Sequence, residues 1–315
     1  MNRGSVRTTM PCPTVALALL LTVAMPLTAA TSKTEAATLY ASGTGNNKIY
    51  TFTPTGAMST FASGVEEPFA IAFNSSGNLF VASELSDAIY EYSPTGVRST
   101  FASGVQSPVG LAFDDHGDLF CDGGSGNIYK FTPTGSQSTF ASGLDAPEGM
   151  AFDSDGNLFV GCANVNTILE FNTAGVQSTF ASGLDFPSDL AFDSSGNLFE
   201  ADDNSGTIYK FTSSGVRSTF ASGMLGVSGL AFDPSGNLFA AFDGGIDEIS
   251  PTGTVTTFVN SEFVADYLAF PPAVPEPSTC FLAIVGGMAL FVMIHRRPNR
   301  TARTCASRDS RHAAS

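Results

Sequence analysis

The stretch "GLAFDDHGDLFCDGGSGNIYKFTPTGSQSTFASG", Gly110–Gly143, contains one complete unit of a repeat. Its last six residues, "STFASG", occur five times, and a degenerate sixth copy reads "TTFVNS". Successive phenylalanines of these copies are 40, 39, 40, 40 and 38 residues apart, at Phe61, Phe101, Phe140, Phe180, Phe220 and Phe258. Self-similarity at a fixed period of this length indicates a structural unit that is stacked or arranged in a ring.

Each unit holds four short segments, which in this copy are "GLAFD", "DLFCD", "NIYKFT" and "STFAS". They alternate apolar with small or polar residues and are rich in Phe, Tyr, Ile and Leu, as strands are. Turn sequences such as "DSSGN" and "PTG" separate them, and Gly there supplies positive φ. Four antiparallel strands in about 40 residues predict a blade of a β-propeller.

Counting these segments predicts 24 strands and therefore an all-β, six-bladed propeller over residues 38–270. The block opens with a second-strand sequence, "TLYAS", and closes with a first-strand sequence, "DYLAF" at Asp266–Phe270. We therefore expect the C-terminal strand to close the ring and protect its edges. "GLAF" suits the crowded centre and "STFAS" the outer edge. The 27 Phe residues of a chain without Trp are expected to pack between blades.

The N-terminal residues are predicted to be a signal peptide over 1–30, followed by a linker over 31–37. Arg3 and Arg7 precede an apolar run from Val15 to Met25 and then small residues, which is typical of secretory signals. Cleavage is expected after Ala30, with Ala36 as the alternative.

The C-terminal segment has three parts: a Pro-rich linker over 271–279, an apolar stretch over 280–294 and a basic tail over 295–315. The apolar stretch would form a short transmembrane helix of about 22 Å. Arginines after it would remain cytoplasmic. The key residues are the Pro-Glu-Pro motif Pro275, Glu276 and Pro277, and the basic residues Arg296, Arg297 and Arg300.

This order of motif, span and Arg cluster resembles the PEP-CTERM sorting signal of Gram-negative bacteria. The resemblance implies processing by signal peptidase and exosortase, transient anchoring in the inner membrane through 280–294, and delivery to the envelope or the extracellular space. The chain departs from the usual signal by continuing to Ser315 beyond the Arg cluster. An ordinary C-terminal membrane anchor is the alternative.

Charge and cysteine content narrow the possible partners. Residues 38–270 hold five basic and 26 acidic residues, a formal charge of −21. Such a surface repels phosphate backbones, so nucleic acid is not an expected partner. Cys121 and Cys162 fit no zinc motif and are expected to be buried free thiols, with a bridge between them as the alternative.

Candidate site residues lie where the repeats disagree, at the start of the "GLAF" strands. Glu148, Asp189 and Asp266 stand there, and carboxylates facing one channel mouth could bind Ca²⁺ or another divalent cation. Solvated loop charges are the simpler interpretation. "DDHGD" and "DSDGN" place Gly at the wrong position for a calcium loop, so they are interpreted as hairpin turns.

The pattern "PxGLAFDxxGNLFVA…IYxFxPTG" over Thr38–Phe270 resembles the NHL repeat and the six-bladed propellers grouped with SMP-30/gluconolactonase and TolB. In lactonases of that type, the resemblance implies one metal held by Glu, Asn and Asp. Glu148 matches the Glu, whereas Ser188 and Ser228 stand where the other two would be. A lyase of streptogramin type would need a catalytic His, and the propeller has only His116, inside a turn.

These observations predict an exported, non-enzymatic scaffold that binds polysaccharide or an envelope protein. The alternative functions are a metal-dependent lactonase or hydrolase of SMP-30/gluconolactonase type, and a periplasmic TolB-like interaction module.

Overall fold

The computed structural model describes residues 37–260 and 265–272. The chain divides into two units, Met1–Glu35 and Ala36–Ser315, and all described residues belong to the second. The predicted signal peptide, the Pro-Glu-Pro motif, the segment 280–294 and the basic tail lie outside the described residues. No helix within the described ranges is long and apolar enough to cross a membrane.

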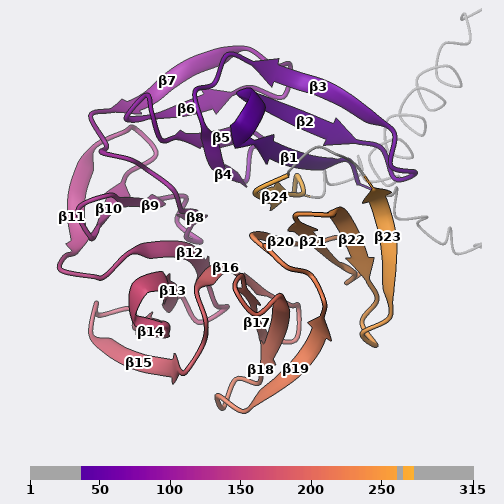
Figure 1. The fold of residues 1–315 in the computed structure, drawn as a ribbon. Helices are drawn as coiled ribbons and strands as arrows, with labels where there is room; N and C mark the ends of the chain where they lie inside the picture. The colour runs from indigo at the N-terminus through magenta and orange to yellow at the C-terminus, as the bar shows by residue number, and fades with distance from the viewer. Residues whose placement is uncertain (1–36, 261–264, 273–315) are drawn as a thin grey trace, which may run out of the picture. The chain divides into compact units, whose positions relative to one another are not determined.

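Six four-stranded antiparallel sheets surround a common axis, as predicted (Figure 1). Blade 1 has the order β24-β1-β2-β3, and blades 2 to 6 follow in chain order from β4 to β23. The inner strands are β4 (Pro68–Phe73), β8 (Leu111–Phe113), β12 (Pro147–Phe152), β16 (Pro187–Phe192), β20 (Gly229–Phe232) and β24 (Leu268–Ala269). The second strands are β1 (Leu39–Gly43), β5 (Leu79–Ser83), β9 (Leu119–Gly123), β13 (Leu158–Cys162), β17 (Leu198–Asp202) and β21 (Leu238–Phe242).

The remaining strands complete each blade outward. The third strands are β2 (Lys48–Phe52), β6 (Ala88–Tyr92), β10 (Asn127–Phe131), β14 (Thr167–Phe171), β18 (Thr207–Phe211) and β22 (Gly245–Ile249). The outer strands are β3 (Met58–Ser63), β7 (Arg98–Ser103), β11 (Gln137–Ala141), β15 (Gln177–Ser182), β19 (Arg217–Ser222) and β23 (Val255–Asn260). Two short 3-10 helices, η1 (Thr44–Asn46) and η2 (Ala163–Val165), follow β1 and β13.

The ring closes through the C-terminal strand, which confirms the expectation from the sequence. β24 pairs with β1 through Leu268 and Ala269, so the strand is shorter than the predicted Asp266–Phe270. The backbone N–H of Ser42 donates to Tyr267 O at 3.0 Å, and the N–H of Asp266 donates to Ser42 O at 3.0 Å. These two hydrogen bonds therefore continue the pairing beyond the N-terminal end of β24.

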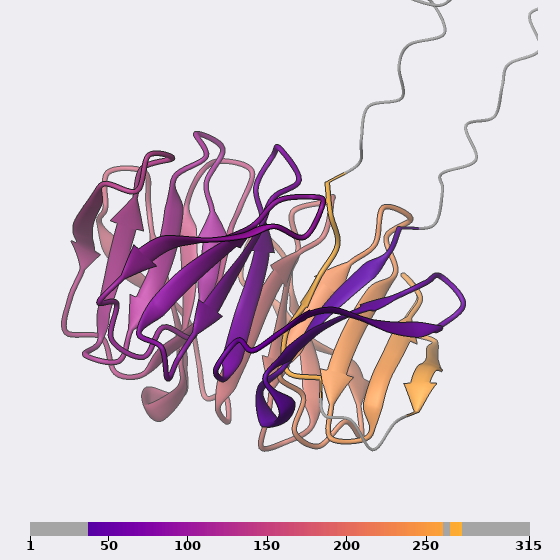
Figure 2. The ribbon, with the colours of Figure 1, turned by 90° about the horizontal axis from the view of Figure 1, so that it is seen from above.

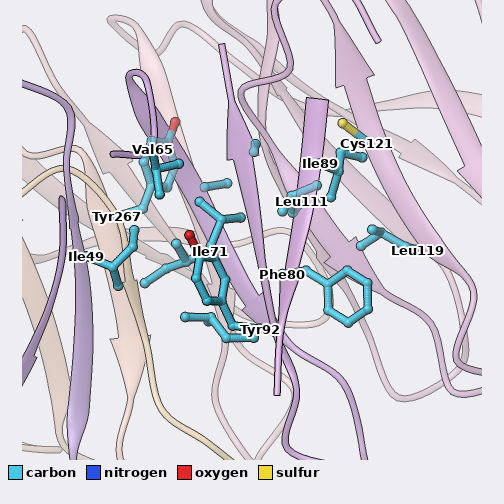
Figure 3. Packing of buried hydrophobic residues seen from close by; sticks show 14 of the residues in the cluster. Ile49, Val65, Ile71, Phe80, Ile89, Tyr92, Leu111, Leu119, Cys121 and Tyr267 are labelled. Carbon is cyan, nitrogen blue, oxygen red and sulfur yellow. The ribbon is translucent and has the colours of Figure 1, made fainter. Parts of the chain in front are cut away.

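Aromatic rings fill the gaps between neighbouring blades. In each gap, a second-strand ring makes an edge-to-face contact with the outer Phe of its own blade and with the inner-strand Phe of the next blade. Phe80 shows the pattern, with ring centroids 5.0 Å from both Phe101 and Phe113. Such pairs add about 0.5–1.5 kcal/mol beyond the area they bury. Figure 3 shows Phe80 among buried aliphatic residues of the same cluster. The ring contacts confirm the predicted role of Phe.

The phenylalanine of "STFASG" lies at a β-bulge in every blade. In blade 1, Ile49 pairs with Ala62 and Tyr50 pairs with Thr60, so Phe61 has no partner across the ladder. The same register shift recurs in the other five blades. A bulge twists the outer strand and makes its free edge a poor template for pairing with another chain.

Strand direction gives the disk two faces (Figure 2). The turn face carries the hairpins that join first to second strands and third to fourth strands. The loop face carries the hairpins that join second to third strands and the loops that lead into the inner strands. Cys121 and Cys162 lie in second strands as buried free thiols, as expected, and burial raises the pKa of Cys162 to about 11.

Candidate functional site: the acidic mouth at the loop face

Glycine allows the inner strands to meet at the centre of the ring. A Cβ at Gly110 would overlap the carbonyl oxygen of Glu148 on the next inner strand. A Cβ at Gly149 or Gly229 would likewise overlap backbone atoms of the following strand. Because none of these three glycines has positive φ, the lack of space alone demands glycine there.

Side chains at the divergent positions connect neighbouring inner strands by hydrogen bonds. The Ser188 hydroxyl lies 2.8 Å from Val227 O and 3.1 Å from Ala201 O, and the Ser228 hydroxyl donates to Asp266 O at 2.9 Å. The two serines that replace the expected Asn and Asp ligands are therefore used to hold blades together.

Asp189 is also a link between blades. Its Oδ1 accepts from the N–H of Leu190 and its Oδ2 from the N–H of Leu230 on β20, both at 2.8 Å. The side chain is 9% exposed. Burial raises the pKa of Asp189 to about 7, although both amide donors oppose the shift.

Asp266 holds the loop that closes the ring. Its Oδ2 accepts from the backbone N–H of Thr44 at 2.9 Å and from the Thr44 hydroxyl at 2.8 Å. Burial raises the pKa of Asp266, and repulsion from Asp243 adds to the increase. Thus Asp266 joins the first and last parts of the propeller.

Glu148 is the predicted site residue whose carboxylate makes no hydrogen bond within the described residues. Burial raises its pKa to about 7, and repulsion from Asp203 adds to the increase. Tyr267, which is buried in the cluster of Figure 3, interacts electrostatically with Glu148, Asp189 and Asp266. Burial raises the pKa of the Tyr267 phenol well above 10, so it remains protonated at neutral pH.

Sequence reasoning missed Asp122, which also lies near this centre. Its Oδ1 accepts from the N–H groups of Val109 and Gly110 at 2.8 and 2.7 Å. Burial raises its pKa, and repulsion from Glu148 adds to the increase. The signal was present, because the other second strands carry Ser42, Ala82, Gly161, Ala201 and Ala241 at this position.

The acidic mouth is a pocket of about 410 Å³ at the loop face. Its lining residues are Asp203, Asn204, Leu225, Gly226, Ser228, Asp243 and Asp266. Burial raises the pKa of Asp203, and repulsion from Asp243, Asp202 and Asp185 adds to the increase. The pocket therefore combines open polar volume with three carboxylates that form no ion pair with a basic side chain among the described residues.

The three predicted metal ligands are not gathered into a cluster. Within residues 37–260 and 265–272, one group has three side chains close enough to share an ion: Asp114, Asp115 and His116 on an exposed hairpin of the turn face. Asp189 and Asp266 use carboxylate oxygens to accept N–H groups, and Ser188 and Ser228 donate to carbonyls. The residues present therefore do not fit the Glu-Asn-Asp metal site of a lactonase.

No family model matches the chain, and no curated protein matches it. Solved structures do match, among them gluconolactonases, a regucalcin from Agrobacterium tumefaciens and virginiamycin B lyase. A nidogen/laminin complex aligns with TM-score 0.69 and 17% identity, covering 75% of this chain and 98% of that one. A putative gluconolactonase gives TM-score 0.61 and 16% identity over 73% and 89%. Virginiamycin B lyase from Staphylococcus aureus gives 0.54 and 13% over 72% and 85%. At these identities the likeness establishes the fold: the chain is an all-β, six-bladed propeller with structural neighbours of gluconolactonase type.

Proposed function

We propose that the protein is an exported scaffold that binds a positively charged protein partner through the acidic mouth. The observation that carries this proposal is the distribution of ion pairs. Among the described residues, the lysines in ion pairs are Lys130 and Lys210, and both neutralise turn-face aspartates. The carboxylates of the mouth repel one another instead.

The surroundings of the mouth favour a protein partner. Leu225 lines the pocket and is 64% exposed, and Leu85 and Val165 are exposed on other hairpins of the same face. The carboxylates of the mouth could pair with Lys or Arg of a partner, and the exposed aliphatic side chains could pack on its apolar residues. A partner segment that carries Lys or Arg among apolar residues would therefore fit this surface. A cationic partner would relieve the repulsion among Glu148, Asp203 and Asp243, and it would lower the pKa of each carboxyl.

Titration calorimetry with a hexalysine peptide tests this proposal. Binding should weaken at least tenfold in the Asp203→Asn/Asp243→Asn variant, and rising salt should weaken it in the wild type. The matched control is Asp115→Asn/Asp155→Asn, which removes the same charge from exposed positions on the turn face. Equal losses in the two variants, or no binding by the wild type, would refute the proposal.

Export and sorting are part of the proposal and depend on residues outside the described ranges. We infer export by the predicted signal peptide and sorting to the envelope or extracellular space through Pro275–Pro277. Mass spectrometry of the mature protein tests the route. A mature chain that ends before Arg296 supports cleavage, whereas a chain that keeps Arg296–Ser315 contradicts it and favours an anchored or periplasmic module.

A hydrolase is the second candidate. The named structural neighbours favour it over a non-enzymatic scaffold, because gluconolactonases and a lyase are among them. Glu148, which interacts electrostatically with the mouth residue Asp203, has a carboxylate that makes no hydrogen bond among the described residues and a pKa of about 7, as a general base needs. A screen of lactones and esters, with and without divalent cations, tests it. Turnover that is lost in Glu148→Gln would establish the hydrolase, and absence of turnover would remove it.

A further inference from the structure

Four pockets at the turn face repeat one arrangement. Their volumes are about 330, 480, 210 and 320 Å³. They lie in four consecutive gaps: between blades 4 and 5, 5 and 6, 6 and 1, and 1 and 2. All but the smallest fall within the usual size range of small-ligand pockets.

Three aromatic rings border each pocket. In the gap between blades 5 and 6 these are Phe199, Phe220 and Phe232, with centroids 4.8 and 5.1 Å from Phe199 to the other two. The outer and inner rings are partly exposed, whereas Phe199 is buried. The other three gaps use Phe159, Phe180 and Phe192, then Phe239, Phe258 and Phe270, and then Tyr40, Phe61 and Phe73.

Polar groups from the hairpins form the rim. Ser195 and Ser235 are exposed at the tips of their turns, and each lines two neighbouring pockets. The second half of each rim comes from a third-to-fourth hairpin or the strand before it, for example Pro251 and Lys210 in the largest pocket. Each pocket thus offers an apolar floor and hydrogen-bonding groups around it.

We propose that these four pockets are equivalent subsites for the sugar residues of an extracellular polysaccharide. A pyranose has C–H faces that pack on aromatic rings and hydroxyls that pair with Ser, Asn and carboxylate groups. A purely apolar ligand would leave this rim unpaired, at a cost of about 1–3 kcal/mol per buried group. Phosphate-bearing ligands would be repelled by the aspartates of the turns. Four similar subsites in an arc suit a polymer of repeating units, since linked weak contacts add through avidity.

This inference does not depend on the acidic mouth, because the pockets open on the opposite face. The pocket positions recur in four consecutive gaps, whereas the mouth is built from residues that occur once. A neutral polysaccharide is expected to bind better than a polyuronate, because Asp153, Asp193 and Asp233 stand at the rims.

The test is affinity electrophoresis of the purified full chain in gels that contain dextran, hydroxyethylcellulose, galactomannan or alginate. We expect retardation by at least one neutral polysaccharide, competed by its free oligosaccharide. The variant Ser76→Trp/Ser195→Trp/Ser235→Trp places bulk at exposed turn tips in all four pockets. Its apparent affinity should fall at least tenfold.

The matched control puts three Trp residues on the loop face: Leu85→Trp/Val165→Trp/Leu225→Trp, all at exposed positions. It should bind as the wild type does. Circular dichroism and the melting temperature establish that both variants are folded. No retardation of the wild type by any of the four polymers, unaltered binding of the turn-face variant, or an equal loss in the control would overturn the inference.

Discussion

At the turn face each blade repeats its neighbour, whereas at the loop face each blade differs from the next. The hairpins at Asp153, Asp193 and Asp233 use the same side-chain bonds to the same backbone positions. On the opposite face, the equivalent positions of successive inner strands hold Gly149, Asp189, Gly229 and Tyr267, which differ in side chain. One disk therefore carries a periodic surface and a single-copy surface.

This difference separates contacts that follow from the repeat from contacts that need a local reason. Contacts that recur in every blade follow from the repeat itself and can support repeated binding, as the four aromatic pockets do. Contacts that occur once need a local reason. At the loop face the reasons are ring closure by Asp266, the link of Asp189 to β20, and the shared negative charge of the mouth.

The largest expected effect comes from a residue that breaks the repeat in the core. Glu200 is 0% exposed, and both of its carboxylate oxygens lack a partner, where other second strands carry Val81, Cys121 and Val160. Burial raises its pKa from 4.5 to about 9, repulsion from Asp202 adds to the increase, and Arg217 opposes it. The stabilising effect of protonated Glu200 is therefore complete below pH 4.5 and is lost between pH 4.5 and 9.

The variant Glu200→Val should remove this dependence. Its advantage over the wild type in unfolding free energy should grow by about 1.4 kcal/mol per pH unit, or about 4 kcal/mol from pH 5 to 8. Urea denaturation at several pH values measures it. Asp155→Asn, at an exposed turn position, serves as control and should leave the slope unaltered. A constant difference between Glu200→Val and wild type would show that Glu200 ionises normally.

The sequence predicted the periodic part of the molecule well. Identical spacing, alternating apolar residues and turn glycines specify local strand pairs, so six blades, the outer "STFAS" strands and closure by the C-terminal strand could be expected. The bulge at Phe61 and its equivalents could not, because alternation does not reveal a residue that pairs with nothing.

For the residues that occur in one blade alone, the sequence predicted the positions but not the contacts. The disagreement of the repeats located Glu148, Asp189 and Asp266, but it could not tell a free carboxylate from one that accepts two amides. That distinction depends on how closely neighbouring inner strands approach, which is a tertiary property. Asp122 also breaks the repeat, but it lies on a second strand, and its approach to the centre depends on the fold.

Packing at the centre of the ring should produce the next largest effect. Gly149→Ala would place a Cβ against the backbone of Asp189, where no rotamer change can relieve the overlap. We expect a loss of about 3 kcal/mol in unfolding free energy, at the upper end of overpacking effects. Gly45→Ala is the control, because nothing lies within 4 Å of its Cβ position. A melting temperature of Gly149→Ala equal to that of the control would mean that the inner strands separate easily.

The smallest effect tests whether the turn face is energetically periodic. In the hairpins that begin at Asp153, Asp193 and Asp233, Oδ1 accepts two N–H groups, and Oδ2 accepts the amide of Asn157, Asn197 or Asn237. Replacing each Asp by Ala should cost about 1 kcal/mol, the usual net contribution of hydrogen bonds at exposed and partly buried positions. The losses at Asp153 and Asp233, measured by urea denaturation, should agree within about 0.5 kcal/mol, the usual error of additivity. The loss at Asp193 should be larger by up to about 1 kcal/mol, because Lys210 Nζ lies 3.5 Å from its Oδ2. Losses at Asp153 and Asp233 that differ by more than this would mean that equivalent side-chain hydrogen bonds do not contribute equally to stability.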